Sequence, residues 1–147
     1  MSQQLSTVAV IDYGMGNLRS VSQAVQHAAY GLNMNVVVTN DPQVIHRAER
    51  VVLPGQGAMR DCMRELREAH NGELLGAVLD AAHRKPLMGV CVGMQMLLDH
   101  SEEQDTPGLG LLMGRGTGRH GRRRRTWRVS AGALRPWWSP PSVWDPP

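Results

Sequence analysis

The chain has 147 residues, of which 41% are hydrophobic and 20% charged, and its formal net charge is +3. This length suits one domain with a sizeable core, while the lack of an apolar run of about twenty residues or of a secretory-type start predicts a cytoplasmic protein with no membrane partner. Two cysteines, Cys62 and Cys91, are too few for a disulfide framework, and a reducing compartment would leave Cys91 free to react.

The composition changes near Gly114. Up to that residue the chain has eight Lys and Arg against twelve Asp and Glu, and from Arg115 onward it has eight Arg against one Asp. All four tryptophans and five of the nine prolines also lie after Gly114. We therefore expect a domain over residues 1–114 and a tail of different character over residues 115–147.

Before residue 114 the hydrophobic pattern alternates between strands and helices. A glycine turn at Gly14 to Gly16 follows the first strand, and Asn17 is placed to cap the helix after it. Strands alternating with helices of about 10 to 15 residues predict an α/β fold, in which a parallel sheet is flanked by helices on both faces. Strands are expected at 7–12, 36–39, 50–53 and 87–90, and helices at 18–30, 58–69 and 73–84.

The most informative stretch follows the last of these strands. Cys91 stands between Gly89 and Gly93, where an apolar run gives way to a helical one. In a G-x-C-x-G elbow the glycines allow a sharp turn from strand to helix, and the helix N-terminus favours the thiolate. The alternative is a buried cysteine in a core strand. Because sites form at the carboxyl ends of parallel strands, the position of Cys91 favours a nucleophile.

Two glycine turns share that edge of the predicted sheet. Pro54-Gly-Gln-Gly57 follows a strand, and the backbone N–H groups of Gly55, Gln56 and Gly57 are candidates to hold an oxyanion together with that of Val92, the residue after the nucleophile. A plain strand-ending turn is the alternative. The turn at Gly14 matches neither a dinucleotide fingerprint nor a phosphate-binding loop.

These motifs resemble the class I glutamine amidotransferases, which have a flavodoxin-like fold. The opening Ile11-Asp-Tyr-Gly-Met-Gly-Asn-Leu-Arg-Ser20 narrows the resemblance to the glutaminase subunits of imidazole glycerol phosphate synthases, over residues 8 to about 114. The resemblance implies that Cys91 attacks the carboxamide of glutamine, that Gln95 contacts the amino-acid end of the substrate and that Glu103 contacts its ammonium. It implies a cyclase subunit as partner, through the Tyr13 to Arg19 side, and no metal or cofactor.

Plainer interpretations of the two polar residues stay open. Gln95 also suits the exposed face of a helix, and Glu103 also suits an acidic, solvated loop from Ser101 to Asp105. A glutaminase subunit serving another acceptor, or a non-catalytic binding protein with a basic tail, is the alternative for the whole chain.

The sequence departs from this family after residue 114. Members carry a strand and a His-Pro-Glu segment that supplies the catalytic base, and no such segment occurs in these 147 residues. After Cys91 come only His100 and His120. If the helix after Cys91 reached His100, nine residues would separate the two by about 13 Å along its axis. We therefore expect an incomplete amidotransferase domain with little or no glutaminase activity, and upstream histidines on the surface.

The tail has three interpretations. Arg122 to Arg125 with nearby tryptophans is compatible with nucleic-acid binding, but a basic tail without a folded reader is weak evidence for that partner. A disordered appendage fits the Pro, Gly and Arg content better. The interpretation we favour is a shifted-frame translation of DNA that encoded the missing strands, because the family pattern is replaced abruptly after Gly108 to Leu112.

Overall fold

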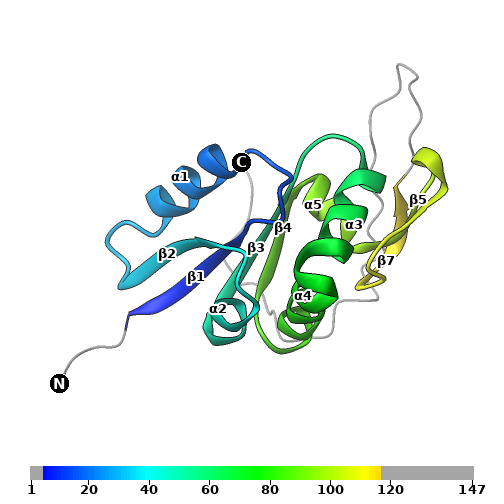
Figure 1. Ribbon diagram of the computed structural model, residues 1–147. Helices are drawn as coiled ribbons and strands as arrows, with labels where there is room; N and C mark the ends of the chain where they lie inside the picture. The colour runs from blue at the N-terminus through cyan, green and yellow to red at the C-terminus, as the bar shows by residue number, and fades with distance from the viewer. Residues whose placement is uncertain (1–4, 117–147) are drawn as a thin grey trace, which may run out of the picture.

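The computed structural model describes residues 5–116 of the chain (Figure 1). Its centre is a sheet of four parallel strands in the order β2-β1-β3-β4. The predicted α/β fold with a parallel sheet is thus confirmed. The strands are β1 (Ser6–Ile11), β2 (Met34–Thr39), β3 (Arg50–Gly55) and β4 (Leu87–Cys91).

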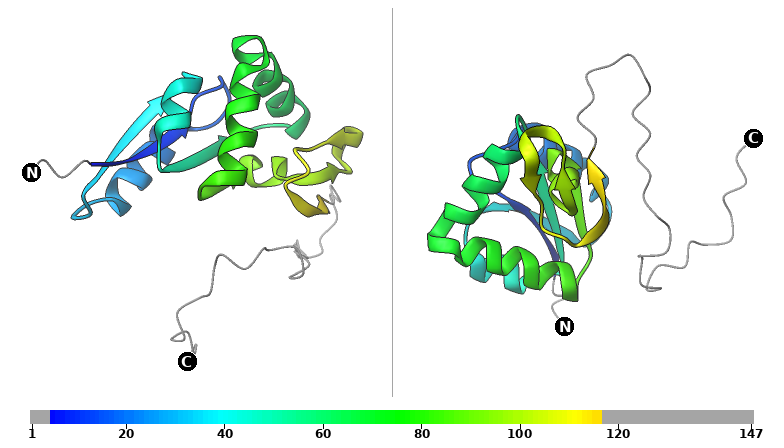
Figure 2. Two further views of the ribbon diagram at one scale, coloured as in Figure 1. Left: turned by 90° about the horizontal axis from the view of Figure 1, so that it is seen from below. Right: turned by 90° about the vertical axis from the view of Figure 1, so that its right-hand side faces the viewer.

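Helices cover the two faces of the sheet unequally. Figures 1 and 2 show α1 on one side of the sheet, and α2, α3 and α4 on the other. On the first side Leu18, Val21 and Val25 of α1 pack on Val8 and Val10 of β1. On the other side a larger core joins β1 and β3 to the remaining helices. The helices are α1 (Leu18–Ala28), α2 (Pro42–Arg47), α3 (Met59–Glu68) and α4 (Glu73–Arg84).

Local sequence explains most of these boundaries. The side chain of Asn17 accepts from the backbone N–H of Ser20 at 3.2 Å, so the predicted cap of α1 is confirmed. The short helix α2 was not predicted from the hydrophobic pattern, yet it begins with a usual signal. Asp41 accepts from Gln43 N at 2.8 Å, and Pro42 occupies the first turn. Its six residues are too few to show helical periodicity.

The helix after Cys91 does not reach His100. Helix α5 (Val92–Met96) has only five residues, and strand β5 (Leu98–Ser101) follows it. The cause is a distant segment, residues 108–112, which takes the carbonyl groups that a longer helix would use. Leu109 N donates to Met96 O at 2.7 Å, and Leu111 N donates to Leu97 O at 2.9 Å.

Strand β5 belongs to a second, three-stranded sheet with the order β6-β5-β7, drawn in yellow tones in Figure 1. Two short 3-10 turns, η1 (Ala69–Gly72) and η2 (Glu103–Asp105), connect neighbouring elements. The remaining strands are β6 (Thr106–Pro107) and β7 (Leu112–Gly116). The acidic loop expected from Ser101 to Asp105 therefore connects two strands of this sheet.

Strand β7 crosses the position of the predicted boundary at Gly114. From residue 117 the predicted tail lies outside the described residues, and so do His120, the arginine run from Arg122 and all four tryptophans. Within the part of the chain that is described, none of the helices has the length and apolar character needed to cross a membrane.

Candidate active site

Cys91 occupies the turn from β4 into α5, as the elbow motif predicts. It is the last residue of β4 and the cap of α5, with φ 57° and ψ −122°. A positive φ is uncommon for a residue with a side chain, and such strain persists only where the surroundings enforce it. The Cys91 side chain is exposed and forms no disulfide. The alternative of a buried core cysteine is therefore wrong for Cys91.

Close backbone packing around the elbow explains why glycines are required there. A Cβ on Gly93 would lie 2.0 Å from the carbonyl oxygen of Leu53, and one on Gly89 would lie 2.5 Å from the Cα of Met94. A Cβ on Gly55 would lie 2.4 Å from Gly93 N. None of these distances is compatible with a side chain. The end of β3 therefore lies directly against the first turn of α5.

The segment Pro54–Gly57, called the oxyanion turn below, is placed beside Cys91 by the register of the sheet. Gly55 lies opposite Cys91 in the parallel pairing of β3 with β4. Two buried side chains contact this turn from the core. The hydroxyl of Tyr13 donates to Pro54 O at 2.6 Å, and the thiol of Cys62 donates to Gln56 O at 3.3 Å. Burial, with a smaller contribution from Cys62, raises the pKa of Tyr13 above its ordinary value.

Of the other predicted site residues, Val92 and Gln95 lie on α5 and Glu103 lies in η2. Val92 is buried at the start of this helix, and its backbone carbonyl carbon would lie 2.9 Å from a Cβ on Gly55. Gln95 is half-buried one turn further along. Glu103 is exposed in η2, where its backbone N donates to Ser101 Oγ at 3.2 Å and its carbonyl accepts from Thr106 Oγ1 at 3.1 Å. The structure thus brings Gly55 and Val92 into contact with the elbow.

None of the histidines in the described part of the chain lies within the elbow, residues 89–93. The four upstream histidines are exposed, as predicted: His27, His46, His70 and His83. His100 lies on β5, where its Nε2 is 2.8 Å from the Asp105 carboxylate. Because α5 ends at Met96, the helical separation expected between His100 and Cys91 does not describe this structure.

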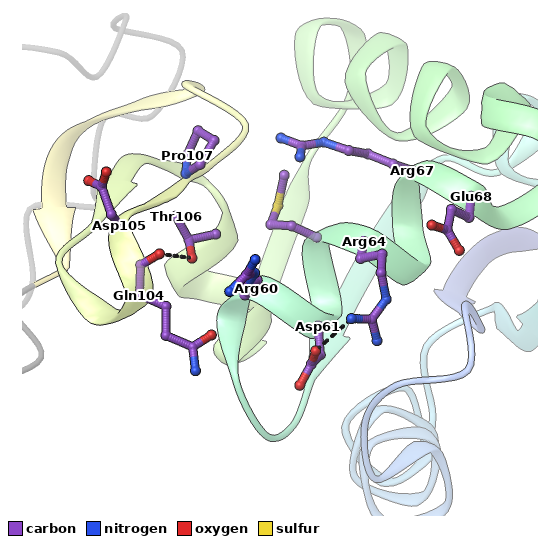
Figure 3. Close-up of a pocket in the computed structure, with 10 residues that line it drawn as sticks. Arg60, Asp61, Arg64, Arg67, Glu68, Gln104, Asp105, Thr106 and Pro107 are labelled. Carbon is purple, nitrogen blue, oxygen red and sulfur yellow. Dashed lines mark hydrogen bonds and ion pairs between the residues drawn. The ribbon is translucent and has the colours of Figure 1, made fainter.

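A pocket of about 820 Å³ lies between α3 and the segment 104–107 (Figure 3). Arg60, Arg64 and Arg67 line it from the helix, and Arg64 Nη1 lies 2.9 Å from Asp61 Oδ1. Hydrogen bonding to Glu65, followed by the charge of Asp61, raises the pKa of Arg64. The lining contains none of the predicted site residues.

Sequence reasoning assigned no site role to Tyr13 or Cys62. The sequence indicates Tyr13 only as part of the opening motif and of the side expected to bind the cyclase, yet its side chain is buried. Cys62 was noted only for its redox state. A tyrosine directly after a strand and before a glycine turn was the available signal, but the hydrogen bond spans 41 residues and is invisible to local patterns.

Comparison with known proteins agrees with this geometry. The family model for glutamine amidotransferase class I matches residues 9–127. The chain is 60% identical over 108 residues to the imidazole glycerol phosphate synthase subunit HisH of Dechloromonas aromatica. The aligned residues make up 74% of this chain and 48% of that protein. It is 56% identical over 113 residues to HisH of Aromatoleum aromaticum, covering 75% of this chain and 50% of the relative.

A third relative, HisH of Nitrosospira multiformis, is 52% identical over 111 residues, covering 76% of this chain and 50% of that protein. The chain thus spans about half the length of the curated relatives it matches. The family match extends over most of the chain and includes both the oxyanion turn and the elbow. This chain belongs to the class I glutamine amidotransferase family.

Proposed function

We propose that this chain is the glutaminase part of an imidazole glycerol phosphate synthase of histidine biosynthesis, acting in the cytoplasm. The observation that carries the proposal is the exposed Cys91, held at positive φ in the elbow and opposite Gly55 in the sheet. This arrangement presents a nucleophile beside backbone N–H groups. The similarity to the HisH relatives supports the narrower assignment within the family.

The reaction proceeds through an acyl-enzyme. The Cys91 sulfur attacks the carboxamide carbon of glutamine, and the carbonyl oxygen becomes an oxyanion that accepts from N–H groups of the Gly55 to Gly57 segment and of Val92. The C–N bond then breaks, and the nitrogen leaves as ammonia after it gains a proton. Water hydrolyses the resulting thioester to glutamate and restores the thiol. Gln95 binds the amino-acid end of glutamine, and Glu103 binds its ammonium.

Ammonia released at Cys91 passes to a cyclase subunit, which binds the side of the chain from Tyr13 to Arg19. In this segment Asn17 and Arg19 are exposed, while Tyr13 is buried. The exposed residues therefore provide the contacts with the partner, and Tyr13 supports the segment from inside. No metal or other cofactor takes part in these steps.

We further propose that this chain hydrolyses glutamine slowly or not at all. A Cys nucleophile needs a base to form the thiolate and an acid to protonate departing ammonia. The His-Pro-Glu segment that the resemblance leads us to expect does not occur in the 147 residues. Loss of the base from such a pair reduces the rate by on the order of several thousandfold.

The test separates nucleophile chemistry from turnover. The purified chain is treated with a chloroketone analogue of L-glutamine, in which a chloromethyl group replaces the amide nitrogen, and the modified residue is located by mass spectrometry. We expect modification at Cys91, protection by L-glutamine and none by D-glutamine. If the chloroketone analogue of D-glutamine modified Cys91 as fast as the analogue of L-glutamine, the proposed function would be contradicted. Glutamate release near that of complete HisH relatives, with cyclase present, would contradict the proposed loss of turnover.

A further inference from the structure

Two side chains from distant parts of the sequence hold the oxyanion turn from the core. We infer that Tyr13 and Cys62 are positioning residues for the attack of Cys91, because their hydrogen bonds fix the orientation of the peptide groups at Pro54 and Gln56. This inference rests on the proposed function, since it concerns the same nucleophile and the same oxyanion donors. Neither side chain contacts the substrate in this mechanism, and both act through the backbone.

The Pro54 carbonyl needs a partner that the sheet does not provide. Val51 N donates to Pro86 O on the β4 side, so the alternation along β3 directs the carbonyls of Val52 and Pro54 toward β1. Strand β1 pairs with β3 only as far as Val52. Pro54 is fully buried, and a buried carbonyl without a partner is costly. The Tyr13 hydroxyl supplies the missing donor at 2.6 Å.

Cys62 performs the same function two peptide groups further on. Its side chain is 0% exposed on α3, and its thiol donates to Gln56 O at 3.3 Å. A buried thiol is inert toward exposed reagents. This cysteine is therefore not a second nucleophile in the folded chain, and its contact with the turn is what assigns it a role.

Fixing a carbonyl also fixes the N–H on the other side of the same peptide bond. Because the peptide group is planar and trans, the carbonyl of one residue and the N–H of the next point in opposite directions. The bond from Tyr13 to Pro54 O therefore holds the peptide group between Pro54 and Gly55, whose N–H points the other way, toward β4, the strand that ends at Cys91. The bond from Cys62 to Gln56 O sets the direction of Gly57 N–H. Gly57 has a φ of +85°, and because glycine can also adopt other conformations, this bond restricts the turn.

The experiment uses the chloroketone analogue of L-glutamine on the full chain. The thiolate of Cys91 first adds to the ketone carbon, which makes the ketone oxygen an oxyanion. The sulfur then displaces chloride from the chloromethyl carbon, and the ketone re-forms as the first carbon–sulfur bond breaks, so no base is needed to protonate a leaving group. The ketone oxygen stands where the carboxamide oxygen of glutamine stands. The maximal inactivation rate therefore reports the oxyanion donors, while the half-saturating concentration reports binding of the amino-acid end.

For Tyr13→Phe we expect the maximal inactivation rate to fall at least about fivefold with an unchanged half-saturating concentration, because misdirected donors lose part of their effect. Methyl methanethiosulfonate, which has no carbonyl group, should modify Cys91 at the wild-type rate in the same variant. The matched control is Tyr30→Phe, since Tyr30 is 90% exposed. If Tyr13→Phe does not fold, Cys62→Ala provides the same test, and Cys62→Ser should recover the rate by restoring a donor.

The outcomes separate the inference from the function on which it rests. If the maximal inactivation rate of folded Tyr13→Phe or Cys62→Ala fell by less than about fivefold, the inference would be overturned. The proposed function would still stand if the L-analogue modified wild-type Cys91 selectively. An equal fall with both reagents would also overturn it, because the effect would then lie in thiol access. Wild-type chain that does not distinguish the L-analogue from the D-analogue would overturn the proposed function and the inference together.

Discussion

Gly55 and Cys91 lie opposite each other at the ends of two neighbouring parallel strands, and a Cβ on Gly55 would lie 2.4 Å from the backbone N of Gly93. The nucleophile and the oxyanion turn are therefore positioned by direct contact between backbones, without intervening side chains. Interiors packed this closely accept added atoms only if the backbone moves. The geometry of the site and the stability of the sheet thus depend on the same few glycines.

Replacing Gly93 by alanine should therefore destabilise the whole domain. The added Cβ would lie 2.0 Å from Leu53 O, a backbone atom that has no freedom to move aside. We expect the free energy of unfolding to fall by at least about 3 kcal/mol, at the upper end of overpacking effects. Urea denaturation followed by circular dichroism measures this change.

Gly76→Ala is the matched control for that substitution. Gly76 lies inside α4, and a Cβ there would meet nothing within 4 Å. Alanine in a helix interior is favoured over glycine by about 0.5–1 kcal/mol, so this variant should be slightly more stable than the wild-type chain. If both variants unfolded at the same urea concentration, the packing argument would be wrong.

The side chain of Lys85 binds the C-terminal end of α2, which lies about forty residues earlier in the sequence. Its Nζ donates to the carbonyls of Ile45, His46 and Ala48 at 3.2, 2.8 and 2.6 Å. These are carbonyl groups at the C-terminal end of a helix, where a cation is favoured. Lys85→Met keeps much of the side-chain volume but removes the donors, and we expect it to lower the free energy of unfolding by about 1–3 kcal/mol.

Arg84→Met serves as the control for Lys85→Met because the two residues are neighbours. Arg84 pairs with Asp80 at 2.9 Å, but its side chain is 74% exposed. Exposed ion pairs contribute about 0–1 kcal/mol. Equal destabilisation by the two substitutions in thermal or urea unfolding would show that the contacts of Lys85 with α2 have no special effect.

The buried Tyr13 should make the chain sensitive to alkaline pH. Burial raises the pKa of this phenol in the folded chain, while an unfolded tyrosine titrates near pH 10. The stabilisation is complete below about pH 10 and is lost as pH rises, because the unfolded state then releases a proton that the folded state retains. The free energy of unfolding should fall by up to about 1.4 kcal/mol for each pH unit above 10 from this residue.

Paired variants isolate that contribution from other groups that titrate in the same range. Tyr13→Phe should have a shallower alkaline limb in a plot of unfolding free energy against pH, and Tyr30→Phe should retain the wild-type slope because Tyr30 is exposed. Identical slopes in the three proteins between about pH 10 and 11.5 would contradict the assignment.

Gln95 is the residue that the proposed function assigns to the amino-acid end of glutamine. Gln95→Ala should raise the glutamine concentration needed to protect Cys91 from the chloroketone by about fivefold to thirtyfold, the equivalent of one or two hydrogen bonds. Gln23→Ala, at an exposed position on α1, should leave protection unchanged. Unchanged protection in Gln95→Ala would favour the plain interpretation of Gln95 as a surface residue of α5.

Prediction from sequence succeeded where local patterns carry the information. The alternation of apolar runs and helical spacing located all four strands of the parallel sheet and the helices α1, α3 and α4. The G-x-C-x-G spacing around Cys91 located the elbow, because both glycines are required by contacts with atoms nearby in the turn or in β3. Helix α2 was missed because six residues give no periodic signal.

Prediction failed where distant segments compete for the same backbone groups. The sequence did not indicate where the helix after Cys91 ends, because Leu109 and Leu111 bind the carbonyls of Met96 and Leu97 and the chain continues into β5. The same limitation concealed the role of Tyr13, whose partner lies in the oxyanion turn. A hydrogen-bond partner 41 residues away leaves no trace in spacing or composition.

The sequence by itself determined that this chain builds a parallel α/β sheet and presents Cys91 at a strand-to-helix turn, because periodicity and glycine spacing are local properties of the chain. Only the tertiary structure decided which strands are neighbours, where α5 ends and which side chains hold Pro54 and Gln56. Those features depend on which buried backbone groups find partners once the core closes, and that is a property of the packed molecule.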